Sequence, residues 1–285
     1  MEADPEKVGL FSFQGVSVMR RIAIYGKGGI GKTTVAANLS VLFARSGSRV
    51  LHVGCDPKRD STYTLANQWP VPTVLHYRHQ GHRDDGFVFL CRHGITGVEA
   101  GGPDPGVGCA GRGLTLAFEA LKETGHFDEN RYDIILFDVL GDVVCGGFAT
   151  PIHGRHASEI YLVVSGELMS LYAANNLARA VARYAERGVR LAGIIPNLRS
   201  GIGTLADVEH FAARIKTRIL PMVARDELFY KAEEARTTLS DLAPDSNGAQ
   251  SLRAVYEAVR DTDLASLIPP TPMNDAEFDT FVRRQ

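Results

Sequence analysis

The stretch "GKGGIGKT", residues 26–33, decides the fold of this 285-residue chain. It fits the pattern G-x-x-x-x-G-K-[ST], follows the short apolar segment "RIAIY" (21–25) and precedes "TVAANLSVLFARSG" (34–47), which has helical spacing. In a loop placed between a strand and a helix in this way, backbone N–H groups and the positive end of the helix surround phosphate oxygens. The stretch therefore predicts a nucleotide-binding loop.

Two side chains of this loop have expected roles in binding phosphate and metal. The Lys32 ammonium should reach the β- and γ-phosphates, and the Thr33 hydroxyl should ligate Mg²⁺. A second lysine, Lys27, is either solvated or, as in the deviant P-loop ATPases that the segment resembles, reaches the nucleotide of a partner subunit. The predicted nucleotide contacts of the loop are Gly26, Lys27, Gly28, Gly29, Ile30, Gly31, Lys32, Thr33 and Thr34.

Short apolar segments alternate with helical segments along the rest of the chain. This alternation predicts an α/β fold with a mostly parallel sheet and helices on both faces. The resemblance of residues 26–33 to the deviant P-loop ATPases implies that the fold is of the deviant P-loop NTPase type. Ligands bind such sheets at the carboxyl ends of the strands. Residues 62–101, rich in His, Arg, Gly and Pro, give no clear pattern. Further strands are predicted at 49–55, 132–138, 159–165 and 189–197, and helices at 168–188, near 204–216 and near 249–262.

Composition excludes several classes of protein. The net charge of −2 argues against a nucleic-acid binder that relies on bulk electrostatics, and no apolar run approaches the roughly 20 residues of a membrane span. Four cysteines are too few and too scattered for a secreted disulfide framework, so we expect a cytoplasmic protein. We predict one domain over 20–270, with an N-terminal extension at 1–19 and a C-terminal tail at 271–285 that is loose or packs on a partner.

Two acidic segments are predicted to converge on the phosphate-binding loop. "GCDPKRDST" follows a strand and places Asp56 and Asp60 near the γ-phosphate and the metal. "LFDVLGD" ends a strand with Asp138, which suits the Mg²⁺ shell, while Asp142 would orient water. Acids at strand ends also act as helix caps, and Asp60 remains a candidate for that role. We interpret the two segments as switches that sense the nucleotide.

Cys109 and Cys145 form a pair of thiols in similar surroundings. Each stands among glycines, in "GVGCAGRG" and "GDVVCGG", which leave room for an inorganic cluster and expose N–H groups to its sulfides. A [4Fe–4S] cluster takes four thiolates, so two per chain are half a set that a symmetric dimer would complete. The alternative is that both are ordinary buried thiols, as we expect for Cys55 and Cys91. Cys145 also lies within eight residues of Asp138, so a moving switch would move a cluster ligand.

Five stretches of the chain together resemble the iron protein of nitrogenase and its relatives: "YGKGGIGKTT", "GCDPKRDST", "GGPDPGVGCAGRG", "DVLGDVVCGGF" and "YAANN". The resemblance covers about residues 20–200. It implies a homodimeric ATPase in which the two subunits bind MgATP and share one [4Fe–4S] cluster. Such proteins accept electrons from a donor such as ferredoxin or flavodoxin. They pass them singly to a catalytic heterotetramer, with ATP hydrolysis gating docking and release.

The resemblance also implies roles for single residues. Cys109 and Cys145 match the ligands of the family's cluster. Asn197, in "PNLRS", resembles the asparagine that contacts adenine. Arg112 matches an arginine of the docking surface that some members carry ADP-ribosylated, and pairing with an acid of the partner is the alternative. The family's nucleotide residues are matched by Lys27, Lys32, Thr33, Asp56, Lys58, Asp60, Asp138 and Asp142, of which Lys27 and Asp142 are the catalytic pair.

The chain combines features of two branches of this family. "DSTYTLANQWPVPTV" and "GITGVEAGGP" resemble the reductase component of dark protochlorophyllide reduction, whereas "GVGCAGRG" and "SGELMSLYAANN" resemble the nitrogenase iron protein. "LHYRHQGHRDD" (75–85) fits neither, and we expect a solvated loop there rather than a metal site. The mosaic favours a nitrogenase-like system outside both branches, with methylthio-alkane reductase, which cleaves C–S bonds to release methanethiol, as the leading candidate. Nitrogen fixation is the next alternative, and the dark chlorophyll pathway is the third.

Two other classes of protein share part of this pattern. A partitioning or positioning ATPase of the deviant P-loop group needs the lysines but neither cysteine, and binds DNA or membrane. The C-terminal "NDAEFDTFVRRQ" is a poor membrane anchor. Cluster-assembly scaffolds typically place a C-x-x-C near the carboxyl end, and this sequence has none. We therefore predict an electron-transfer protein with neither nucleic acid nor membrane as its partner.

Overall fold

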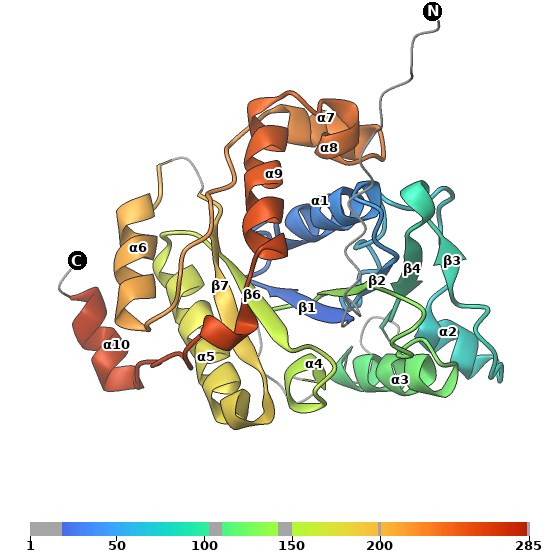
Figure 1. The fold of residues 1–285 in the computed structure, drawn as a ribbon, viewed down its shortest axis with the longest axis horizontal. Helices are drawn as coiled ribbons and strands as arrows, with labels where there is room; N and C mark the ends of the chain where they lie inside the picture. Colours follow the sequence, from blue (N-terminus) through green and yellow to red (C-terminus); the bar gives the residue numbers. More distant parts are fainter. Residues whose placement is uncertain (1–18, 103–109, 142–149, 199–200, 284–285) are drawn as a thin grey trace, which may run out of the picture.

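The computed structural model describes residues 19–102, 110–141, 150–198 and 201–283. Seven strands of this part form one sheet in the order β3-β4-β2-β5-β1-β6-β7 (Figure 1). All neighbouring strands are parallel except β3 and β4, which are antiparallel. The strands are β1 (Arg20–Tyr25), β2 (Val50–Gly54), β3 (Phe89–Leu90), β4 (Thr96–Glu99), β5 (Ile134–Asp138), β6 (Glu159–Val164) and β7 (Arg190–Pro196). The predicted α/β fold with a mostly parallel sheet is confirmed.

Helices cover both faces of the sheet, and each face has its own apolar core. α1 (Lys32–Arg45) and α9 (Asn247–Arg260) pack on one face, where their buried side chains meet those of β1, β5 and β6. α3 (Ala110–Glu123) and α5 (Leu168–Tyr184) pack on the other face. The remaining helices are α2 (Val74–His79), α4 (Thr150–His153), α6 (Leu205–Arg214), α7 (Leu228–Glu234), α8 (Leu239–Leu242) and α10 (Asp275–Val282), with short 3₁₀ turns at Arg92–Gly94, Ala185–Arg187 and Leu264–Ser266.

The stretch without a clear sequence pattern contains regular structure. β4 has only the four residues "TGVE", too few to show an alternation of apolar and polar side chains, yet it pairs in parallel with β2. The histidine-rich segment at 75–85, expected as a solvated loop, is helical in its first half, because α2 runs to His79. Thr73 caps this helix by accepting a hydrogen bond from the N–H of His76. In the described part of the chain, no three His, Cys, Asp or Glu side chains are grouped to hold a metal.

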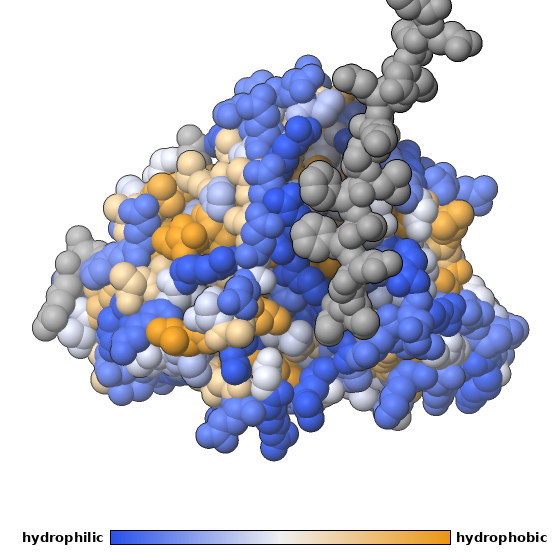
Figure 2. Space-filling view, viewed as in Figure 1, coloured by the Kyte–Doolittle hydropathy of each residue, from blue (hydrophilic) through white to orange (hydrophobic). Residues whose placement is uncertain are grey.

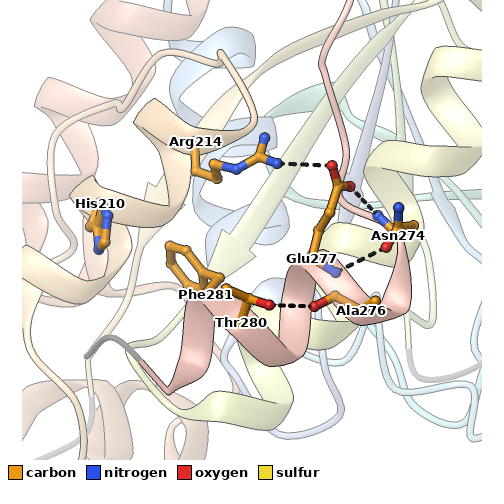
Figure 3. Close-up of a pocket in the computed structure, with 7 residues that line it drawn as sticks. All are labelled: His210, Arg214, Asn274, Ala276, Glu277, Thr280 and Phe281. Atoms are coloured by element: carbon orange, nitrogen blue, oxygen red, sulfur yellow. Dashed lines mark hydrogen bonds and ion pairs between the residues drawn. The ribbon is translucent and has the colours of Figure 1, made fainter.

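The C-terminal segment, expected to be loose or to pack on a partner, packs on its own chain. Met273, Phe278 and Phe281 are buried in the core shared with α5 and α6. Figure 3 shows α10 beside α6: Asn274 and Glu277 form a reciprocal cap, and Glu277 also pairs with Arg214 of α6 at 3.4 Å. An open cavity of about 410 Å³ lies between these two helices, at the side of the molecule away from the phosphate-binding loop.

On the face shown in Figure 2, the outer surface of the helices is mostly hydrophilic. Polar and charged side chains cover α9 and the region of α2 and α3. The apolar patches on this face are separated from one another. Among the described residues, none of the helices has the length and apolar character that crossing a membrane requires.

Candidate nucleotide-binding site

The phosphate-binding loop joins β1 to α1, as the sequence predicts. Gly31 precedes the helix with φ 92° and ψ 16°, a left-handed conformation that glycine adopts without strain. The helix then begins at Lys32, whose side chain is buried. The first turn of α1 contains no acidic residue, so the positive end of the helix faces the loop without a counter-charge from its own first turn. This arrangement suits an anion such as a nucleotide phosphate.

Asp138, at the carboxyl end of β5, lies beside this loop. Its Oδ2 accepts hydrogen bonds from the hydroxyls of Thr33 and Ser61, each at 2.7 Å. Its Oδ1 is buried and has no hydrogen-bond partner among the described residues. Burial raises the pKa of Asp138, while Lys32 and the two hydroxyls act to lower it. A buried carboxylate oxygen without a partner, next to a threonine hydroxyl, fits a hard cation such as Mg²⁺.

The first acidic segment reaches the same site from β2. Asp56 is buried, and its Oδ1 accepts a hydrogen bond from the N–H of Lys58 at 3.0 Å. Asp60 borders a cavity of about 320 Å³ together with Thr33. Burial, followed by the charge of Asp56, raises the pKa of Asp60. After Asp60 the chain forms turns and not a helix, so a helix-capping role, the alternative considered for this residue, has no helix to act on.

Asn197, at the end of β7, closes one side of the loop. Its side-chain Nδ2 donates to the carbonyl oxygen of Ile30 at 2.7 Å. It lines a cavity of about 250 Å³ that also includes Gly31, Val35 and Phe229. This cavity is next to the phosphate-binding loop and has apolar and polar lining residues, Asp226 among the latter, which suits a nucleotide base. The adenine contact predicted for Asn197 stays a prediction.

Lys27 points to a carboxylate of its own chain. Its Nζ lies 3.1 Å from Oε2 of Glu167, which precedes α5. Both side chains are partly exposed, so this ion pair is weak and easily exchanged. Sequence reasoning gave Lys27 either solvent or the nucleotide of a partner as its contact and did not identify Glu167.

Glu99 is a third buried carboxyl near this site, and it was not predicted from the sequence. It ends β4, and its Oε1 accepts hydrogen bonds from the N–H of Thr62 at 2.6 Å and from the Thr62 hydroxyl at 2.7 Å. Burial raises the pKa of Glu99 to about 8. The two hydrogen bonds from Thr62 connect the end of the first acidic segment to β4. A glutamate directly after apolar residues in "GVEAGGP" was the available signal.

The predicted cluster ligands Cys109 and Cys145 and the predicted water-orienting Asp142 lie outside the described residues, and so does the side chain of Arg112. The strands that lead to the two cysteines are described. β4 and β5 both flank β2 and run parallel to it, so their carboxyl ends lie at one edge of the sheet. The chain leaves this edge toward both cysteines. Cys55 and Cys91 are buried, as expected, and burial raises the pKa of the Cys91 thiol to about 12.

Comparisons with known proteins agree with this geometry. The family model of 4Fe-4S iron sulfur cluster binding proteins, NifH/frxC family, matches residues 20–285. The chain is 44% identical over 274 residues to the nitrogenase iron protein of Methanospirillum hungatei, which covers 93% of this chain and 95% of that protein.

Solved structures with a similar fold include cell-division ATPases. The MinD ATPase of Pyrococcus furiosus has a TM-score of 0.66 at 20% identity over 85% of this chain and 99% of that chain. The septum site-determining protein MinD of Pyrococcus horikoshii, solved with Mg-ADP, has a TM-score of 0.65 at 23% identity over 87% of this chain and 98% of that chain. Likenesses at this level of identity show the fold alone.

Proposed function

The chain belongs to the NifH/frxC family of 4Fe-4S cluster-binding proteins, and we propose that it is the ATP-dependent one-electron donor of a nitrogenase-like enzyme. The observation that carries the proposal is the pairing of Thr33 with Asp138, whose Oδ1 is unpartnered among the described residues, at the edge from which the chain leads to both predicted cluster cysteines. Nucleotide binding and cluster ligation would therefore share one edge of the sheet.

The nucleotide would be held by the phosphate-binding loop. Lys32 and the N-terminal end of α1 would bind the phosphates, and Thr33 and Asp138 would hold Mg²⁺. Asp56, Lys58 and Asp60 would sense the γ-phosphate from the first acidic segment. The adenine would occupy the cavity beside Asn197. Asp142, three residues before Cys145 in "LFDVLGDVVCGG", would orient the attacking water.

The cluster would be shared by two chains. Cys109 and Cys145 supply two thiolates, and a [4Fe–4S] cluster takes four, which supports a homodimer with the cluster on its two-fold axis. When bound, the cluster supplies a carrier for one electron at a time. The electron donor would be a small redox protein such as ferredoxin or flavodoxin. The acceptor would be a catalytic heterotetramer that docks around Arg112.

Lys27 would couple the two nucleotide sites. In one subunit it pairs with Glu167, and closure of the dimer would exchange this carboxylate for the phosphates of the opposite nucleotide. Lys27→Ala should keep nucleotide binding and lose coupled electron transfer, whereas Glu167→Gln should keep both. Pre-steady-state transfer measured beside equilibrium nucleotide binding separates the two properties. Wild-type transfer rates in Lys27→Ala would exclude the role across the interface.

The proposal is tested by the release of iron from an anaerobic preparation. An iron chelator should bleach the brown protein quickly with MgATP and slowly without nucleotide, because the nucleotide would move the segment that carries Cys145. Cys109→Ala and Cys145→Ala should each yield protein without cluster. Cys91→Ala is the matched control, since Cys91 is buried elsewhere and should leave the iron content unchanged. Iron content that is the same in all three variants would exclude the proposal.

For the specific system we propose methylthio-alkane reductase. The support is the mixture of the two sequence branches and the histidine-rich segment around α2, which fits neither branch. Nitrogen fixation is the second candidate, favoured by the 44% identity to a nitrogenase iron protein. Purified catalytic components, each combined with this protein, MgATP and a reductant, discriminate the candidates. Methanethiol from a methylthio-alkane supports the first, ammonia from dinitrogen supports the second, and turnover of protochlorophyllide would support the third.

A partitioning ATPase is the alternative from another class, because the same fold occurs in the MinD structures. That function requires the nucleotide site but no iron. Binding of the MgATP form to DNA or to lipid vesicles, by protein that contains no iron after anaerobic reconstitution, would establish it in place of electron transfer.

A further inference from the structure

A series of hydrogen-bonded, buried polar side chains leads to Asp138 of the nucleotide site. It begins at Ser40 of α1, continues through His52 in the middle of β2, and reaches Ser61, and the side chains of all three are 0% exposed. The hydroxyl of Ser40 lies 2.8 Å from Nδ1 of His52, and Nε2 of His52 lies 2.8 Å from Oγ of Ser61. Ser61 then donates to Oδ2 of Asp138 at 2.7 Å.

His52 is a polar residue in a strand that is otherwise apolar and fully buried. β2 reads "VLHVG", every residue of it is buried, and it lies between β4 and β5 near the middle of the sheet. An apolar side chain would satisfy such a position, whereas an imidazole has two nitrogens that must both find partners. Burial lowers the pKa of His52 to about 3, so the ring is neutral at physiological pH.

The hydrogen bonds of this series can have only one assignment of donors and acceptors. Ser61 has one hydroxyl hydrogen, and it is given to the carboxylate of Asp138, which can only accept. Oγ of Ser61 must therefore accept from Nε2–H of His52. A neutral imidazole has one N–H, so Nδ1 accepts from the hydroxyl of Ser40. The ring is thus held as its Nε2–H tautomer.

We propose that His52 is a positioning residue of the nucleotide site, which fixes the direction of the Ser61 hydroxyl and so holds the Asp138 carboxylate with Oδ1 toward the metal. The inference rests on the proposed function only in assigning Mg²⁺ to Asp138. Oδ2 is held by Thr33 and Ser61, and Thr33 is expected to turn its oxygen to Mg²⁺. Ser61 is then the remaining donor to Oδ2, and His52 prevents its hydroxyl from turning elsewhere.

Two amide variants separate positioning from simple packing. In His52→Gln, the terminal amide can reach the place of Nε2 and donate to Ser61. In His52→Asn, the shorter amide reaches only the place of Nδ1 and faces Ser40. We expect His52→Asn to weaken MgATP binding and slow hydrolysis by about 3- to 10-fold, the effect of one buried hydrogen bond, and His52→Gln to restore both to near the wild-type values. Binding of ATP without Mg²⁺ should be the same in all three proteins.

Each outcome of this comparison supports or overturns the positioning role. Equal losses in the Gln and Asn variants, or losses that are the same with and without Mg²⁺, would mean that His52 only fills space. Ser61→Ala should reproduce the loss seen in His52→Asn, and it remains informative if a histidine variant fails to fold. Wild-type protein that fails to bind MgATP would instead overturn the proposed function, so the two failures are distinguishable.

The tautomer gives a readout that does not depend on activity. In the oxidised, cluster-loaded dimer, labelled with ¹⁵N-histidine, the His52 signal should be that of a neutral Nε2–H ring that does not titrate between about pH 6 and pH 8. This signal should be missing from His52→Gln. An Nδ1–H tautomer for His52, or titration of its ring in that range, would overturn the inference.

Discussion

Asp138 and Glu99 are both buried carboxyl groups at carboxyl ends of strands on either side of β2. Both are held by neighbouring residues of the first acidic segment, Asp138 by Ser61 and Glu99 by Thr62. Each also has one buried oxygen without a hydrogen-bond partner in the described part of the chain, Oδ1 of Asp138 and Oε2 of Glu99. In position and in their bonds to the first acidic segment the two groups are alike, and Asp138 has one further bond, from Thr33.

Their charged neighbours are different. Burial and the charge of Asp60 raise the pKa of Asp138, but the charge of Lys32 acts against them and favours the carboxylate. The charges that act on Glu99 are those of Asp138 and Asp60, which add to burial and raise its pKa to about 8. At neutral pH Glu99 is therefore mostly protonated and holds Thr62 as a neutral group, while Asp138 is suited to a cation. Location at the edge of a parallel sheet is therefore not enough to suit an acid to binding a cation. The Lys32 ammonium, which acts on Asp138, distinguishes Asp138 from Glu99.

The largest effect is expected for Asp138→Asn. The neutral amide keeps the size of the side chain but removes the negative charge that would hold Mg²⁺, so ATP hydrolysis should fall by about 100-fold or more. Binding of ATP without Mg²⁺ should be retained. Glu99→Gln is the matched control and should hydrolyse ATP within about 3-fold of wild type, because Glu99 is already neutral. Equal losses in the two variants would show that the distinction between the acids is wrong.

The second-largest effect is expected at Gly54, whose lack of a side chain leaves room for the Glu99 carboxyl. A Cβ at this position would overlap Oε2 of Glu99 and would lie 2.6 Å from Cβ of Ser61. Gly54→Ala should lower the free energy of unfolding by about 2 kcal/mol through overpacking, measured by anaerobic thermal unfolding. Adding Glu99→Ala should recover part of this loss. Simple additivity of the two substitutions would mean that Glu99 does not occupy this space.

The pH dependence of stability tests the protonation of Glu99. Its pKa is raised from 4.5 to about 8 in the folded protein, so folding binds a proton between these values. This contribution is fully present below pH 4.5 and is lost as the pH rises through about 8. Wild type should therefore lose up to about 1.4 kcal/mol of stability per pH unit relative to Glu99→Gln over this range. Parallel curves for the two proteins would contradict a raised pKa.

The smallest effect is expected for Thr62→Val, which removes the hydroxyl bond to Glu99 and keeps the N–H bond. The loss should be about 1 kcal/mol, the net value of one hydrogen bond. Because the Thr62 hydroxyl lowers the pKa of Glu99, its removal should also move the pH-dependent loss of stability to higher pH. Unfolding of Thr62→Val at several pH values measures both effects. A shift to lower pH would contradict the assigned bond.

The fold and the phosphate-binding loop could be predicted because both depend on local sequence. The strands β1, β2, β5, β6 and β7 are apolar runs, and the loop has a fixed pattern of glycines with a lysine. Thr33 and Asp138 were both predicted to bind Mg²⁺ and so to lie close together, because ligands bind at the carboxyl ends of parallel strands. The structure brings the two side chains within hydrogen-bond distance.

The contacts that were missed depend on register between distant segments. His52 meets Ser61 because the chain turns back after β2, and Glu99 meets Thr62 because β4 pairs with β2. Neither relation leaves a periodic signal in the sequence. α3 was missed for a different reason: its first turn carries Gly111 and Gly113, which indicate a loop by composition.

A cluster shared by two chains is the claim on which the proposed function depends. Native mass spectrometry of an anaerobic preparation, with chemical determination of iron, measures it. We expect a dimer with four iron atoms per two chains and, with MgATP, one nucleotide per chain. A monomer that holds four iron atoms by itself, or a dimer that holds none after reconstitution, would contradict it.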